Sequence, residues 1–148
     1  MGSVKIENCL HEYNNIFKEN DNIYRDVAKR LGLSECAFWI LYVLRADDTI
    51  STQSEICGAW YQSKQTVNSA LKNLEANGYI ELRCVKDRRS KAISLTDKGI
   101  NISQKTVDKV IKAEQEALSS LNAEEQEAFI SLFHKYTDAL KAQMQKFV

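Results

Sequence analysis

The chain of 148 residues has no proline and only five glycines. Proline breaks a helix interior and glycine weakens it, so this scarcity indicates long uninterrupted helices. No apolar run reaches the length of about 18 residues that a membrane span needs, and the opening MGSVKIENCLHEYNN is too polar for a secretory signal. We therefore expect a cytoplasmic protein without membrane contact, folded as one domain over residues 1–148.

Metal, disulfide and catalytic motifs are also missing from the sequence. Its four cysteines (9, 36, 57 and 84) form no C-x-x-C pair, which argues against a disulfide framework. Cys9 lies close to His11, but there are only two histidines and no cluster of four ligands, so we expect no metal. Paired carboxylates, a phosphate-binding glycine loop and a nucleophile beside a base do not occur, so we expect neither an enzyme nor a cofactor.

Net charge is zero, with 20 basic and 20 acidic residues, but the charges are unevenly distributed. Residues 61–96 carry seven basic and three acidic side chains, whereas acids outnumber bases in residues 1–60 and 97–148. The loop KDRRSK, residues 86–91, places four cations around one acid. Local charge sets the field that a phosphate backbone meets at close range, so a neutral chain is compatible with nucleic-acid binding.

Apolar periodicity predicts a mainly α protein with one small β-hairpin. The expected helices cover residues 4–31, 35–45, 52–59, 63–77, 97–121 and 123–147. Ile80 and Leu82, and later Ile93 and Leu95, alternate with polar residues as strands do, which places the cationic loop at the tip of a hairpin. Two short helices joined by about three residues match a helix-turn-helix, and the hairpin that follows is then a wing. We expect this winged helix-turn-helix over residues 34–99.

Start and stop signals support these boundaries. Ser34, Ser63 and Thr96 are placed to cap the helices that follow them. Gly32 and Gly78 are placed to end the helices that precede them. Two further helix starts read as capping boxes, Thr52-Gln53-Ser54-Glu55 and Asn122-Ala123-Glu124-Glu125.

The helix at residues 63–77 has a polar face suited to reading DNA. Val67, Leu71 and Leu74 share one side with Ala70 and must point into the core. The remaining face carries amide, hydroxyl and ammonium groups, which hydrogen-bond base edges and phosphates in a major groove. Any solvated helix face is polar, but here the first acid, Glu75, comes late. The candidate major-groove residues are Ser63, Lys64, Gln65, Thr66, Asn68, Ser69 and Lys72.

The hairpin tip supplies a second candidate DNA contact. Arginine is attracted to the negative potential of a narrow minor groove, and Asp87 is within reach to orient Arg89. The alternative is a solvated loop whose cations keep an edge strand soluble. Four cations beside a polar reading helix favour the DNA-binding interpretation. The candidate wing residues are Lys86, Asp87, Arg88, Arg89 and Lys91.

DRRSKAISLT, with GYIEL before it, resembles the wing signature of the MarR family of bacterial transcriptional regulators: D-x-R, a polar stretch, then L-T. SKQTVNSALKNLEANGYIE is similar to that family's recognition helix. The helix order agrees over the whole chain, and residues 50–99 carry the specific motifs. The resemblance implies a homodimer that binds pseudo-palindromic double-stranded DNA, usually as a repressor relieved by a small molecule or oxidation. By motif position, Asp87 and Arg89 are the wing pair and Arg88 lies at the tip.

Apolar stripes at both ends exceed what one small domain can cover, and we expect a second copy to bury them in residues 4–31 and 100–148. The alternative is a last helix folded back on its own domain. The candidate dimerisation residues are Ile6, Leu10, Tyr13, Phe129, Phe133, Tyr136, Leu140, Met144 and Phe147.

Three alternatives concern the signal and the partner. Cys9 could be a redox switch, although Glu7 and Glu12 nearby disfavour a reactive thiolate. Aromatic residues could line a pocket for a small aromatic or lipophilic effector, although such stripes are more often core. The wing could instead dock an acidic protein partner. The aromatic set is Tyr13, Phe17, Tyr24, Phe38, Trp39, Tyr42, Trp60 and Tyr61.

Overall fold

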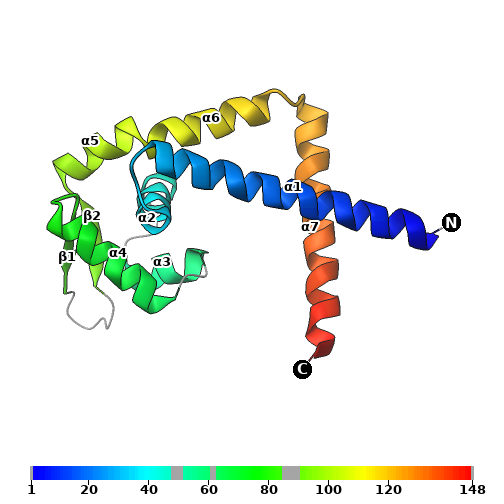
Figure 1. Cartoon of the computed structure of the whole chain (residues 1–148), viewed down its shortest axis with the longest axis horizontal. Helices are drawn as coiled ribbons and strands as arrows, with labels where there is room; N and C mark the ends of the chain where they lie inside the picture. The colour runs from blue at the N-terminus through cyan, green and yellow to red at the C-terminus, as the bar shows by residue number, and fades with distance from the viewer. Residues whose placement is uncertain (1, 48–51, 61–62, 85–90, 148) are drawn as a thin grey trace. The chain divides into compact units, whose positions relative to one another are not determined.

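A computed structural model describes residues 2–47, 52–60, 63–84 and 91–147 (Figure 1). The chain forms two compact units, Met1–Lys109 and Val110–Val148. No helix among the described residues is long and apolar enough to cross a bilayer. The elements, in order, are α1 Gly2–Arg30, α2 Glu35–Ala46, α3 Gln53–Trp60, α4 Lys64–Ala76, β1 Ile80–Arg83, β2 Ala92–Leu95, α5 Asp97–Lys105, α6 Val107–Ser119, α7 Ala123–Met144 and the 3-10 turn η1 Gln145–Phe147.

The core of the first unit is built around α2, which packs against α1, α3, α4 and α5. This helix is apolar on most sides and is the central helix that the sequence predicts. Helix α4 also packs against α3 and β1, so α3 and α4 form the predicted helix-turn-helix. The fully buried large side chains include Phe38, Ile40, Leu41, Ile56, Val67, Leu71, Ile80 and Val107.

Most predicted caps are confirmed. The side chains of Ser34, Ser63 and Thr96 accept the expected backbone N–H bonds, and Gly32 and Gly78 have φ of 73° and 78°. The start of α7 forms a complete capping box between Asn122 and Glu125.

The start of α3 differs in one bond from the predicted capping box. Thr52 Oγ1 accepts from the backbone N–H of Glu55 at 3.2 Å, as predicted. The Glu55 carboxylate, however, accepts from the Thr52 hydroxyl at 2.7 Å. In a full capping box this carboxylate would accept from the backbone N–H of the cap residue. Here it accepts from the hydroxyl of that residue instead.

The β-hairpin follows α4 directly and is antiparallel, with Ile80 opposite Leu95 and Arg83 opposite Ala92. An isolated bridge pairs Thr52 with Ala92, and the backbone N–H of Gln53 donates to the carbonyl of Lys91 at 3.2 Å. The segment that leads into α3 is therefore joined to the base of the hairpin. The predicted tip residues Lys86, Asp87, Arg88 and Arg89 lie outside the described residues.

The prediction of one long helix after Thr96 is wrong, because the helix is interrupted at Thr106. The backbone of Thr106 has φ −125° and ψ −91°, which ends α5. Its hydroxyl donates to the carbonyl of Ile102 at 2.7 Å, and the buried Ser103 hydroxyl donates to Gly99 at 2.8 Å. Serine and threonine hydroxyls that bond back to helix carbonyls favour a bend. The interruption was not visible in the apolar spacing, which continues through it.

An ion pair holds the first turn after this interruption. Arg45 at the end of α2 donates to both carboxylate oxygens of Asp108, at 2.9 and 2.6 Å. Both side chains are 28% exposed, so the pair is partly shielded from water. Bidentate geometry fixes orientation as well as distance. The start of α6 is therefore fastened to α2 within the first unit.

Candidate nucleic-acid interface

Helix α4 presents its polar face to solvent. Val67, Leu71 and Leu74 are at most 3% exposed and Ala70 is 8% exposed, which confirms the face that the periodicity assigned to the core. Gln65, Ser69 and Lys72 lie opposite this buried face. All seven candidate major-groove residues are exposed. They are Ser63, Lys64, Gln65, Thr66, Asn68, Ser69 and Lys72.

The first turn of α4 is fixed by its cap. Ser63 Oγ accepts from the backbone N–H of Thr66 at 3.1 Å, and the hydroxyls of Ser63 and Thr66 lie 2.7 Å apart. Because Thr66 uses its hydroxyl within this cap, it is less free to read a base than the sequence suggested. The unpaired N–H groups of a helix N-terminus favour an anion such as phosphate.

One contact on this face was missed by sequence reasoning. Gln53 Nε2, at the start of α3, donates to Asn68 Oδ1 on α4 at 3.2 Å. The two residues are separated by 15 positions, and Gln53 stood out only as the second residue of a capping box. The contact joins the two helices of the helix-turn-helix at a candidate base-reading residue.

The described part of the hairpin contributes exposed charge beside α4. Lys91 is exposed at the end of the tip loop. Arg83 forms an exposed ion pair with Glu81 on the same strand at 3.0 Å. Surface pairs of this kind contribute little to stability. Lys91 is thus the candidate wing cation whose position the structure describes.

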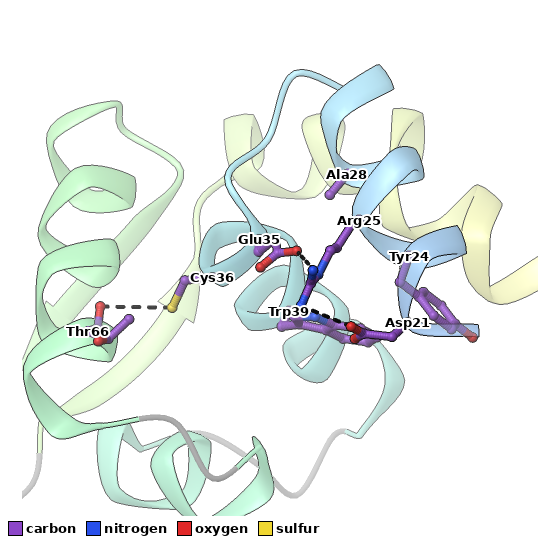
Figure 2. A pocket seen from close by; sticks show the side chains of 8 residues that line it. All are labelled: Asp21, Tyr24, Arg25, Ala28, Glu35, Cys36, Trp39 and Thr66. Atoms are coloured by element: carbon purple, nitrogen blue, oxygen red, sulfur yellow. Dashed lines mark hydrogen bonds and ion pairs between the residues drawn. The ribbon is translucent and has the colours of Figure 1, made fainter. Parts of the chain in front are cut away.

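A pocket of about 380 Å³ lies within the first unit, between α1, the start of α2 and the first turn of α4 (Figure 2). Arg25 bridges two acids there, Asp21 at 3.0 Å and Glu35 at 3.1 Å. The rings of Tyr24 and Trp39 lie 5.1 Å apart. The lining therefore combines two carboxylates, one guanidinium and two aromatic rings, and its volume is within the range of small-molecule sites.

Two of the cysteines differ in their surroundings. Cys36, in the wall of this pocket, points its thiol toward the carbonyl of Thr66, with 3.9 Å between sulfur and oxygen. Burial, and then the nearby Cys57, raise the pKa of the Cys36 thiol above its ordinary value of 9.0. Cys9, the candidate redox residue, is exposed on α1. Among the described residues, no group of three or more histidine, cysteine or acidic side chains could hold a metal.

The candidate dimerisation residues form exposed apolar faces on both units. Ile6 and Leu10 are exposed on α1, whereas Tyr13 is half-buried. On the second unit, α7 contains no buried residue, and its candidate residues are all exposed. Five equally exposed residues of these helices were not among the candidates predicted from the sequence. They are Ile16, Phe17, Ile23, Ile130 and Leu132. The α7 face consists of Phe129, Phe133, Tyr136, Leu140, Met144 and, in η1, Phe147.

A helix-turn-helix whose second helix runs directly into an antiparallel hairpin defines a winged helix-turn-helix protein. The model of the MarR family matches residues 31–90, which span this motif. This part of the chain is therefore similar to the MarR family.

Solved structures have a similar fold over nearly the whole length of the chain. S. aureus MepR in its complex with DNA is 26% identical, with a TM-score of 0.67, over 88% of this chain and 96% of that one. NMB1585, a MarR family regulator from Neisseria meningitidis, is 20% identical, with a TM-score of 0.78, over 94% of this chain and 98% of that one. A MarR protein from Peptoclostridium difficile is 20% identical, with a TM-score of 0.67, over 95% and 92%. No curated protein sequence matches the chain.

Proposed function

We propose that the protein is a transcriptional regulator that binds double-stranded DNA sequence-specifically, as a homodimer on a pseudo-palindromic operator. Repression by occluding a promoter is the expected outcome of such binding. The observation that carries the proposal is the exposed face of α4, which is polar over its first three turns and reaches its first acid at Glu75. The likeness to a MepR chain in a DNA complex supports the same function.

In this proposal α4 lies in the major groove. Lys64 and Lys72 contact phosphates, and Gln65, Asn68 and Ser69 face base edges. The hairpin beside α4 brings Lys91, together with the cations of the tip, to the neighbouring backbone or minor groove. Phosphate contacts supply most of the affinity and base contacts supply the sequence preference.

A second copy of the chain is the partner we propose for the exposed apolar faces of α1 and α7. Fourteen large apolar residues are exposed on the described chain, nearly all of them on these two helices. Exposed apolar side chains that line one face of a helix favour an interface. A two-fold dimer would present two α4 helices about one turn of DNA apart, roughly 34 Å.

The test is binding of purified protein to fragments of the DNA upstream of its own coding region, over a salt series and with random-sequence competitor. Tight binding that resists competitor and weakens steeply with salt is expected. A winged-helix module that docks an acidic protein instead predicts no salt-dependent binding to any duplex. That result would refute the DNA-binding proposal.

The regulatory signal could be oxidation of Cys9 or binding of a small molecule, and the two predict different results. A regulator switched through Cys9 would lose operator binding on peroxide treatment, and a Cys9→Ser variant would keep it. A ligand-responsive regulator would be released by a small molecule under reducing conditions in both proteins. We propose the second, because the Figure 2 pocket reaches the first turn of α4 through Thr66.

The charge of this pocket favours a small aromatic cation as effector. Its two carboxylates exceed its single guanidinium by one negative charge, and an aromatic face attracts a cation within about 6 Å. A bound cation would compete with Arg25 for Asp21 and Glu35. An aromatic anion would be repelled by both carboxylates.

Trp39 provides the readout for this site. In a Trp60→Phe variant Trp39 is the single tryptophan, because the chain has two. Its fluorescence should change on titration with an aromatic amine and not with benzoate, and the change should weaken in an Asp21→Asn, Glu35→Gln variant. A response to benzoate that survives both substitutions would contradict the site.

A further inference from the structure

We propose that Gln53, on the helix before the recognition helix, determines which base edge Asn68 reads. In this proposal Asn68 selects a base that offers hydrogen-bond acceptors in the major groove, guanine above all. The inference rests on the proposed DNA binding and concerns the origin of its sequence preference.

The contact that carries the inference joins the two helices. Gln53 Nε2 donates to Asn68 Oδ1 at 3.2 Å. Asn68 is exposed. Of its two neighbours along the helix, Val67 is buried and Ser69 is exposed. It therefore stands on the flank of the solvent face of α4, within reach of both α3 and a bound duplex.

Gln53 is held in place by three neighbouring interactions. Its backbone N–H donates to Lys91 at the base of the hairpin, at 3.2 Å. Thr52, directly before it, is 5% exposed and pairs with Ala92. The hydroxyl of Thr52 caps α3 through the N–H of Glu55. A side chain that starts from a backbone fixed on both sides loses little additional freedom when it makes a hydrogen bond, so it can orient its partner.

The bond gives the Asn68 amide a direction. An amide has one acceptor oxygen and one nitrogen with two donors, on divergent branches. Because Oδ1 is bonded to Gln53, the nitrogen is turned away from α3 and keeps its donors for another partner. Asn68 therefore faces DNA chiefly as a donor.

The major groove distinguishes bases by this property. Guanine presents two adjacent acceptors, N7 and O6, whereas thymine presents one, O4, and adenine presents one, N7. The usual asparagine contact with adenine requires the amide to donate to N7 and to accept from N6 at the same time. An oxygen held by Gln53 is poorly placed to accept from N6, and cytosine offers only a donor. The order of preference is guanine, then thymine and adenine with one acceptor each, and cytosine last.

The test is selection of binding sites from a pool of randomised duplexes, followed by competition between the four bases at the position that an Asn68→Ala variant relaxes. In the wild-type protein guanine should exceed adenine there at least about fivefold, the lower end for one good base contact. Gln53→Ala should bring this ratio close to one, because the amide is then free to turn.

Gln53→Glu gives the sharper test, because it should reverse the base preference at the position that Asn68 reads. A carboxylate only accepts, so it would bond to the Asn68 nitrogen and turn Oδ1 outward. The preference should then move to adenine or cytosine, which present donors. The added negative charge weakens binding to all sequences equally, and it cancels in a ratio taken within one variant. In an Asn68→Ala background Gln53→Glu should leave the ratio unchanged, and the other operator positions provide the internal control.

The outcomes separate this inference from the function on which it rests. If no duplex is selected, the proposed function fails and the inference fails with it. If a site is selected but the ratio is the same in wild-type, Gln53→Ala and Gln53→Glu proteins, only the inference is overturned. It is also overturned if Asn68→Ala relaxes no position, or if the relaxed position is adenine or cytosine in the wild-type site.

Discussion

Gly99, three residues into α5, is a position where one methyl group would meet the backbone of another element. A Cβ there would lie 1.9 Å from the carbonyl oxygen of Tyr79 and 3.1 Å from a methyl group of Leu95. The same oxygen accepts from the backbone N–H of Thr96 at 3.1 Å, so it cannot move without disturbing the turn into α5.

We therefore expect Gly99→Ala to lower the free energy of unfolding by about 2 kcal/mol or more, the cost of overpacking a close contact. Gly58 in α3 is the matched control, since a Cβ there meets no atom within 4 Å. Gly58→Ala should be neutral or stabilising by about 0.5–1 kcal/mol, because alanine favours a helix. Urea unfolding of both variants measures the difference, and equal midpoints would contradict the expectation.

The Cys36 thiol should be slow to react at neutral pH. Its raised pKa, caused first by burial and then by Cys57, means that little thiolate is present below the ordinary value of 9.0. Alkylation of Cys36, followed by peptide mass spectrometry over a pH series, should show a midpoint above 9.0. Cys57→Ser should lower that midpoint by removing the second cause. A midpoint below 9.0 in the wild-type protein would contradict this.

Single residues show which parts of the site sequence reasoning can reach. The caps at Ser34, Ser63 and Asn122 were predictable because each bond spans three residues of one segment. The Gln53–Asn68 bond spans 15 positions, and the Arg45–Asp108 pair spans 63. No local pattern signals contacts of that length, since they depend on how separate helices pack.

At the scale of elements, a feature could be predicted where it changes the apolar spacing of the sequence, and not where the spacing continues unchanged. The faces of α2 and α4 were predicted because apolar spacing and burial coincide there. The division between α5 and α6 was not, because apolar residues continue at helical spacing through Thr106. The break arises from two hydroxyls and a distant ion pair, none of which changes the hydrophobic pattern.

The exposed face of α7 leads to a prediction about assembly. Phe129 and Phe133 stack with centroids 6.3 Å apart, and Phe133 is 50% exposed. If a second copy covers this face, Phe133→Glu should weaken the dimer at least about thirtyfold, as loss of a central aromatic contact does. Sedimentation over a concentration series measures this.

Ser131 on the same helix provides the control for that variant. It lies about 200° from Phe129 around the helix, on the opposite side, and it is exposed. Ser131→Glu adds the same charge and should leave the dimer intact. A wild-type protein that sediments as a monomer at all concentrations, or equal weakening by both variants, would contradict an interface on this face.

At the scale of the whole molecule, neutrality and DNA binding are compatible because the charges are separated along the chain. Residues 61–96 hold an excess of four positive charges, and the remainder is slightly acidic. The winged helix-turn-helix could be predicted because residues 50–99 combine apolar periodicity with specific motifs. The pocket could not, because its lining comes from three helices separated in sequence.

This separation of charge predicts different salt responses for two lysines of equal charge. Lys72 is exposed on the reading face of α4, and Lys112 is exposed on α6. If affinity arises from local phosphate contacts, Lys72→Gln should weaken binding to all duplexes and reduce the slope of log affinity against log salt by about one. Lys112→Gln removes the same charge outside residues 61–96 and should leave the slope unchanged, because the proposal assigns the phosphate contacts to cations of that segment. Equal slopes for the two variants would mean that net charge, and not the α4 surface, controls binding. A sharper base preference in Lys72→Gln with an unchanged slope would assign Lys72 to a base contact.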